Sequence, residues 1–99
     1  MTSTARVVVT PRGRGRFHVE VRSDGVTTTY AVEVPTGMAA ELGWGADEEA
    51  DLVSASFRFL LEREPAASIL PRFSLEVIEH YFPEYRSQIR RHNTGRNGT

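Results

Sequence analysis

The chain has 99 residues, 39% of them hydrophobic and 25% charged, with a formal net charge of −1 at pH 7. This length fits one domain with one core, and the composition is that of an ordinary soluble globular protein. The absence of cysteine excludes disulfides, thiolate catalysis and zinc sites built on thiolates. No apolar run approaches the ~20 residues of a membrane span. We therefore expect a cytoplasmic protein that has no cofactor and does not associate with membranes.

The near-neutral total conceals a basic–acidic–basic order along the chain. Residues 1–22 hold five arginines and one glutamate, a net charge of +4. Residues 33–64 hold eight carboxylates and two arginines, a net charge of −6, and residues 86–99 hold four arginines. Such an uneven distribution suits charge-selective contacts at the two basic margins.

Three segments in the first third of the chain have the pattern of β-strands. Residues 6–10 are rich in β-branched side chains and stop before Pro11, residues 16–22 alternate cleanly between apolar and polar, and residues 26–34 alternate more weakly. The Asp24-Gly25 pair favours a tight hairpin between the last two, because glycine tolerates positive φ. We predict an antiparallel β-meander of two or three strands with one apolar face.

The rest of the chain predicts helices interrupted by prolines. A short helix over residues 37–42 precedes a long helix over residues 48–64, which Asp47 caps and Pro65 ends. A proline-stiffened elbow and C-terminal helices follow. The fold class is α+β, with the N-terminal meander packed against the long central helix. We expect one domain over residues 6–91, a flexible segment at residues 1–5 and a disordered tail at residues 92–99.

The long helix carries more apolar surface than one sheet can cover. One stripe at helical spacing consists of Ala50, Val53, Phe57, Leu60 and Leu61. Leu52 and Phe59 lie on another face, seven residues apart. This second stripe requires another partner, which is either the C-terminal helix of the same chain or a second copy of the protein.

One long pattern, interrupted twice by proline, covers about residues 50–90, with weaker agreement over residues 30–35. It consists of Ser56-Phe57, Phe59-Leu60-Leu61-Glu62-Arg63-Glu64-Pro65, Ser68-Ile69-Leu70, Phe73, Leu75, Val77-Ile78 and Tyr81-Phe82-Pro83-Glu84-Tyr85. In this pattern the chain resembles a family of small, uncharacterised bacterial proteins. The resemblance implies a shared architecture of elbow and helices, and it carries no catalytic residue to this chain.

Groups that could support catalysis or bind a metal are scattered. His18, His80 and His92 fall on a predicted strand, a predicted helix and the tail. Glu76, His80 and Glu84 recur at intervals of four residues, but Pro83 interrupts their helix, so a solvated charged face is the simpler interpretation. We predict no catalytic residue, no metal site and no enzymatic activity.

Residues 12–16, with the sequence Arg-Gly-Arg-Gly-Arg, are the best candidate for a segment that contacts a ligand. The glycines remove obstruction while the arginines offer charge to phosphates or to acidic protein surfaces. The C-terminal arginines join this segment if the last helix packs near the first turn of the meander. The candidate anion-binding set is Arg12, Arg14, Arg16, Arg86, Arg90 and Arg91, and a solvated hairpin loop is the alternative interpretation.

We predict a non-enzymatic protein-interaction or regulatory module that self-associates through its central helix, with a second copy or another protein as partner. The predicted interaction residues are Leu52, Phe59, Tyr81 and Tyr85. The alternative function is weak nucleic-acid binding through the arginines, which an isoelectric point near 6.3 makes less favoured. A third hypothesis, a small-molecule enzyme, requires a closed pocket that contains His18 or His80 beside a carboxylate.

Overall fold

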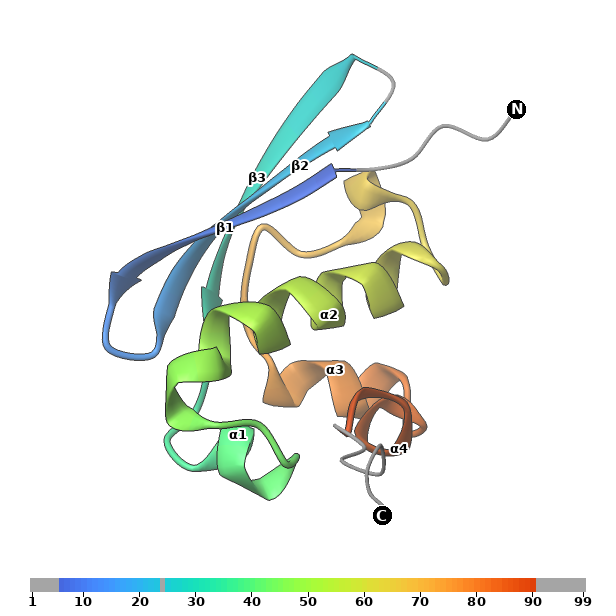
Figure 1. Cartoon of the computed structure of the whole chain (residues 1–99). Coiled ribbons are helices and arrows are strands. Elements are labelled where there is room, and N and C mark those ends of the chain that lie inside the picture. The colour runs from blue at the N-terminus through green and yellow to red at the C-terminus, as the bar shows by residue number, and fades with distance from the viewer. Residues whose placement is uncertain (1–5, 24, 91–99) are drawn as a thin grey trace.

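A computed structural model describes residues 6–23 and 25–90 of the chain. It contains a four-stranded sheet with the helices on one side (Figure 1). The predicted α+β class is confirmed. The segments expected to be flexible or disordered, residues 1–5 and 92–99, lie outside the described residues. No described helix combines the length and the apolarity needed to cross a membrane.

The predicted meander is confirmed and has three strands. Strands β1 (Arg6–Gly13), β2 (Arg16–Ser23) and β3 (Val26–Glu33) pair antiparallel in the order of the chain. Ser23 pairs with Val26 across the second turn, where Gly25 has a φ of 79°. This positive φ is the conformation for which a hairpin turn selects glycine.

Pro11 was expected to end the first strand, but the strand continues past it. Strand β1 continues to Gly13, with an irregular register between Pro11 and Gly13. Because β1 is the edge strand of the sheet, it has a neighbour on one side only. An edge strand accommodates the missing N–H of a proline, so the strand bends at Pro11 and continues.

In the part of the chain that the structure describes, four α-helices and two 3₁₀ turns follow the meander. They are α1 (Met38–Glu41), the 3₁₀ turn η1 (Ala46–Glu48), α2 (Glu49–Leu61), the 3₁₀ turn η2 (Ala66–Ser68), α3 (Glu76–Tyr81) and α4 (Tyr85–Ile89). Helix α2 is therefore shorter at both ends than predicted. Asp47 does not cap it but lies within η1, where the Glu48 carboxylate accepts a hydrogen bond from the Gly45 N–H at 2.7 Å.

A fourth strand, which was not predicted, lies in the elbow, the segment of residues 65–74 that leads from α2 to α3. Strand β4 (Arg72–Ser74) pairs parallel to β3, with Arg72 opposite Ala31 and Phe73 opposite Val32. A parallel pair requires a long crossover connection, and α1, α2 and the elbow provide it. The strand has three residues, too few for an alternating pattern to be recognised.

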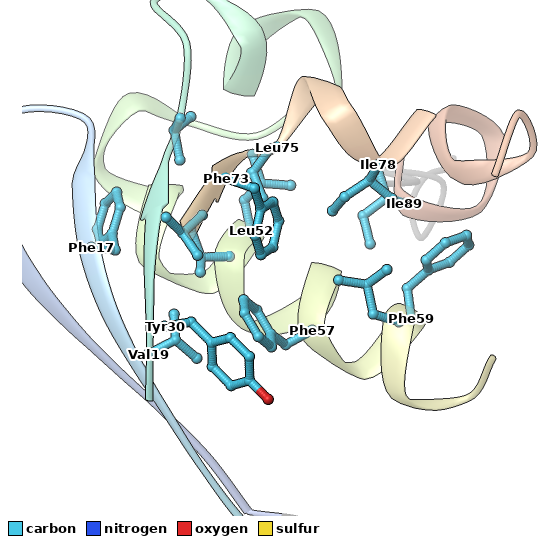
Figure 2. Packing of buried hydrophobic residues seen from close by; sticks show 14 of the residues in the cluster. Phe17, Val19, Tyr30, Leu52, Phe57, Phe59, Phe73, Leu75, Ile78 and Ile89 are labelled. Carbon is cyan, nitrogen blue, oxygen red and sulfur yellow. The ribbon is translucent and has the colours of Figure 1, made fainter. Parts of the chain in front are cut away.

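One side of α2 covers the sheet. The Phe57 ring lies 5.0 Å from the ring of Tyr30 on β3 and 5.8 Å from that of Phe73 on β4 (Figure 2). Tilted aromatic pairs at such distances add to the stabilisation from burial. The Tyr30 hydroxyl, at the end of this cluster, donates a hydrogen bond of 2.7 Å to the carbonyl oxygen of Ala66. It thereby joins the sheet to the elbow.

The other side of α2 is covered by the C-terminal helices. The Phe59 ring meets the rings of Phe82 and Tyr85 edge-on, at 5.9 Å and 5.3 Å, and the Arg63 guanidinium lies 3.7 Å from its centre. In Figure 2, Phe59 points toward Ile78 and Ile89 and away from the sheet. Of the two partners considered for the second stripe, the same chain's C-terminal helices provide the cover. A second copy is therefore not needed to cover these two residues.

A buried pair of hydroxyls fixes α4 against α2. Ser56 donates a hydrogen bond of 2.8 Å to the carbonyl oxygen of Leu52, one turn earlier, and its oxygen lies 2.7 Å from the Tyr85 hydroxyl. Because the single Ser56 proton is used within the helix, Tyr85 is the donor of this second bond. Burial outweighs the opposing effect of the hydrogen bond with Ser56 and raises the pKa of Tyr85 to about 12.

This pair predicts a stability difference that depends on pH. Tyr85→Phe leaves the Ser56 oxygen without its donor, so we expect the free energy of unfolding at neutral pH to fall by about 1–2 kcal/mol. Between pH ~10 and ~12 the unfolded chain loses the Tyr85 proton while the folded chain keeps it. The contribution of this group is thus complete below pH ~10 and is lost as pH rises toward 12, by about 1.4 kcal/mol per pH unit.

Urea unfolding of wild type and variant across this range measures the difference. The wild type should lose its advantage over Tyr85→Phe above pH ~10, because the variant lacks the titrating hydroxyl. Tyr81→Phe is the matched control: the Tyr81 side chain is 68% exposed, and its variant should stay within about 0.5 kcal/mol of the wild type at neutral pH. A constant difference between wild type and Tyr85→Phe from pH ~9 to ~12 would contradict the assignment.

Candidate functional site

The four predicted interaction residues separate into two environments. Leu52, Phe59 and Tyr85 are buried within the protomer, so they offer no surface to a partner. Their place in this set is corrected, because α3 and α4 fold back over the face of α2 that they occupy. Tyr81 is different, since it is the most exposed of the large hydrophobic residues that the structure describes.

Tyr81 stands beside an apolar groove between the elbow and α3, which we call the elbow groove. Its volume is about 280 Å³. Its lining is almost entirely apolar and consists of Leu60, Ile69, Leu70, Phe73, Val77, Ile78, Tyr81 and Phe82, together with Glu64 and Ser68. Leu70, at the rim, is 48% exposed. Leu70 was named only within the long pattern over residues 50–90, and the groove was not predicted.

The local chain path explains why this groove exists. The last turn of α2 ends in backbone bonds from Arg63 and Glu64 to the Leu60 carbonyl, and Pro65 then turns the chain away. The segment between η2 and β4 returns to the sheet along one side of the groove, and α3 forms the other. Ile69 and Phe73 point into the core from this segment, so Leu70 between them is left at the surface.

Glu64 gives the groove a single charge. It is half-buried and is the charged member of the described lining. The neighbouring Arg63 does not neutralise it, because Arg63 binds Glu84 at 3.1 Å and Glu62 at 3.4 Å. Among the described residues, no arginine or histidine forms an ion pair with Glu64. The groove therefore combines apolar walls with one uncompensated carboxylate.

The predicted anion-binding arginines lie in different parts of the structure. Arg12 and Arg16 line a hollow of about 320 Å³ on the sheet, which also includes His18, Glu33 and Arg72. Arg72 was not predicted as a member, because only the parallel pairing of β4 brings it beside the meander. The one signal for it in the sequence is the polar–apolar–polar order of Arg72-Phe73-Ser74, which is too short to indicate a strand.

Arg14 points toward a broader hollow of about 670 Å³ next to the first. Three carboxylates, those of Glu33, Glu49 and Glu76, belong to the lining of this second hollow. Arg16 lines this hollow as well as the first one, so the charges of Arg14 and Arg16 are both partly offset here, whereas Arg12 lines only the first hollow.

The C-terminal arginines do not join the first turn of the meander. Helix α4 packs against α2 and α3, well away from the turn between β1 and β2 (Figure 1). Arg86 is engaged in ion pairs with Glu79 at 2.9 Å and Glu41 at 3.2 Å. The hydrogen bond with Glu41, followed by the charge of Glu79, raises the pKa of Arg86. Arg90 lies exposed after α4, and Arg91 is outside the described residues.

The histidines that the structure describes lie on separate elements. His18 lies on the sheet and His80 on α3, while His92 is outside the described part of the chain. Within residues 6–23 and 25–90, no three His, Asp or Glu side chains are placed to hold a metal ion. The series Glu76, His80 and Glu84 is broken because α3 ends at Tyr81, and Glu84 binds Arg63 instead.

Comparison with models of protein families, with curated proteins and with solved structures finds no match for this chain. What the two surfaces do must therefore be argued from their own residues.

The tight turn that carries Arg14 and Arg16 depends on Gly15. Its φ is 69°, and a Cβ atom added there would lie 2.9 Å from the carbonyl oxygen of Val34. The Gly15 carbonyl oxygen also accepts a hydrogen bond of 2.8 Å from the Val34 N–H. The chain is therefore held close to the end of β3 at this point, which fixes the direction from which the neighbouring arginines leave the turn.

Two glycine variants separate the cost of positive φ from the cost of this close approach. Gly15→Ala should lower the free energy of unfolding for two reasons. Alanine in the left-handed conformation costs ~1–2 kcal/mol, and the Val34 carbonyl must also move away from the added Cβ atom. Gly25→Ala has a similar φ, 79°, but open space around the added atom, so it should cost only the first part. Urea denaturation measures both, and equal losses for the two variants would refute the role assigned to Gly15.

Proposed function

We propose that this chain is a non-enzymatic protein-interaction module that binds a short segment of another protein in the elbow groove. The segment carries a large apolar side chain next to an arginine or lysine. The observation that supports this proposal most directly is the combination, in one depression, of apolar walls, two exposed apolar side chains and one uncompensated carboxylate.

The apolar part of the groove favours a protein ligand. Leu70 and Tyr81 stand at its rim with 48% and 68% of their surface exposed, next to the buried Ile69 and Phe73. Covering such side chains releases water from apolar surface, and aromatic residues in partly formed pockets contribute much of the affinity at protein interfaces. A volume of about 280 Å³ is at the small end of ligand pockets and suits one or two side chains of a partner.

The carboxylate of Glu64 determines the second feature of the partner. A half-buried carboxylate without a cation forms stronger charge-assisted hydrogen bonds than an exposed one, because the surrounding dielectric constant is lower. The groove therefore prefers a basic residue beside the apolar anchor over a neutral or acidic one. Charge matching of this kind mainly selects the correct partner and excludes acidic segments.

The elbow groove replaces the central helix as the proposed interaction surface. Leu52 and Phe59 are buried, so the self-association predicted through α2 has no exposed residues at these positions. Association of two copies through the groove is instead one of the outcomes that an experiment must distinguish.

Selection from a displayed library of random peptides tests the proposal. Peptides enriched on the wild-type protein should share a large apolar residue adjacent to Arg or Lys. Their affinity should fall about tenfold or more for Leu70→Asp, which places a charge at the groove rim, and several-fold for Glu64→Gln. Val26→Asp is the matched control, because Val26 is an exposed apolar residue, 62% accessible, on the β2–β3 hairpin and outside the lining of the groove.

Three results would overturn the proposal. Enriched peptides without a shared apolar–basic pattern would remove the assigned partner chemistry. Equal loss of affinity in Leu70→Asp and Val26→Asp would remove the groove as the binding surface. A wild-type dimer in sedimentation velocity that dissociates in Leu70→Asp but not in Val26→Asp would assign the groove to a second copy of the chain.

A further inference from the structure

The face of the sheet opposite the helices is a second surface, which we call the open face. All four α-helices lie on the other side of the sheet (Figure 1), and no described helix covers this one. Alternation along β2 places Phe17, Val19 and Val21 under the helices, where they are buried. Arg16, His18, Glu20 and Arg22 therefore face outward.

The open face is basic although the whole chain is slightly acidic. The strand registers place four arginines and two glutamates on it, and Arg12 lines its hollow, which gives a net charge of +3 against −1 for the whole chain. These residues are Arg6, Arg12, Arg16, Arg22, Arg72, Glu20 and Glu33. The isoelectric point of the whole chain therefore underestimates the attraction between this face and an anion, because the compensating carboxylates lie elsewhere.

The hollow on the open face is formed by a row of residues across three strands. Ala31 on β3 is paired with His18 on β2 and with Arg72 on β4. The small alanine between two long side chains leaves the depression of about 320 Å³, and Arg12 and Arg16 close one end of it. Neighbouring strands are ~4.8 Å apart, so Arg72 lies ~10 Å from β2 across the hollow.

The arginines around this hollow have no carboxylate partner. Arg12, Arg16 and Arg72 form no ion pair with any described residue, whereas Arg22, farther along β2, binds Glu20 at 3.0 Å. Glu33 lies at the edge of the hollow, opposite Arg16 in the register, without an ion pair to it. Three guanidinium groups are thus available for forked hydrogen bonds, which match phosphate oxygens.

The shape of the open face favours an elongated anion. From Arg16 the basic side chains continue to Arg22 and to Arg6, its partner on β1, about 20 Å away along the strand. The hydroxyls of Thr10 and Thr29 lie between the two ends, that of Thr27 lies opposite Arg22, and threonine and arginine are common donors to nucleic-acid phosphates. Among the described residues the face has no Phe, Tyr or Trp side chain on which bases could stack, since Phe17 and Tyr30 are buried on the covered side.

We infer that the open face binds the phosphate backbone of a nucleic-acid strand, without reading its base sequence. Arg12, Arg16 and Arg72 hold consecutive phosphates at the hollow, and Glu33 limits the affinity. This site is independent of the elbow groove.

Fluorescence anisotropy with a labelled single-stranded DNA oligonucleotide of about 24 residues tests the inference. Three phosphate contacts predict a slope of about −2 for log affinity against log salt concentration. Arg72→Ala should weaken binding about threefold or more and make the slope shallower by about 0.7. Glu33→Gln should strengthen binding several-fold. Arg58→Ala is the matched control, because it removes the same charge from an exposed, unpaired position on α2 and should leave binding nearly unchanged.

The same experiment distinguishes other anions. Binding undetectable at low salt, a salt slope near zero, or an equal effect of Arg58→Ala and Arg72→Ala would overturn the inference. Displacement of the oligonucleotide by a mononucleotide at equal phosphate concentration would assign the hollow to a small phosphate compound instead. Equally tight binding of poly-glutamate, with the same dependence on Arg72, would assign the face to an acidic polypeptide. The salt dependence is measured on the wild-type protein alone, so this part of the test does not depend on whether the variants fold.

Discussion

The structure depends on a helix that is buried on two opposite sides. Phe57 and Phe59 are two residues apart on α2, which places them about 200° apart around the helix axis. Phe57 packs on Tyr30 and Phe73 in the sheet, and Phe59 packs on Phe82 and Tyr85 in the C-terminal segment. A single turn of helix thus holds three layers together: the sheet, α2, and the pair α3 and α4. The few polar groups between the layers, such as Ser56, are hydrogen-bonded.

Both proposed binding surfaces follow from this layering. Because every α-helix is stacked on one face of the sheet, the other face remains open and collects the polar side chains of the strands. Because the chain must return from the end of α2 to the sheet edge before it forms α3, the elbow passes over the core without filling the space beside α3. The two surfaces differ in charge: Arg12, Arg16 and Arg72 surround the hollow on the sheet, whereas Glu64 lies in the groove.

Local sequence patterns predicted the strands and helices better than they predicted which of these elements pack together. The alternation in residues 16–22 and the Asp24-Gly25 signal indicated the meander, and the two stripes of the long helix indicated that both of its sides are apolar. The pattern of Leu52 and Phe59 shows that a cover is needed but not which segment provides it. Arg86 and Arg72 illustrate the same limit. Arg86 binds Glu41, which is 45 residues away in the sequence. Arg72 lies on the open face because the three-residue strand β4 pairs parallel to β3.

Urea unfolding of Phe59→Ala at two protein concentrations that differ about tenfold tests the central claim, the burial of α2 on both sides within one protomer. The variant should lose about 3–5 kcal/mol of unfolding free energy, the usual cost of removing a buried phenylalanine ring. The unfolding midpoints of wild type and variant should not depend on concentration. A loss below about 1 kcal/mol would contradict the burial of Phe59. A wild-type midpoint that rises with concentration while that of Phe59→Ala does not would show that another molecule covers the second side of α2.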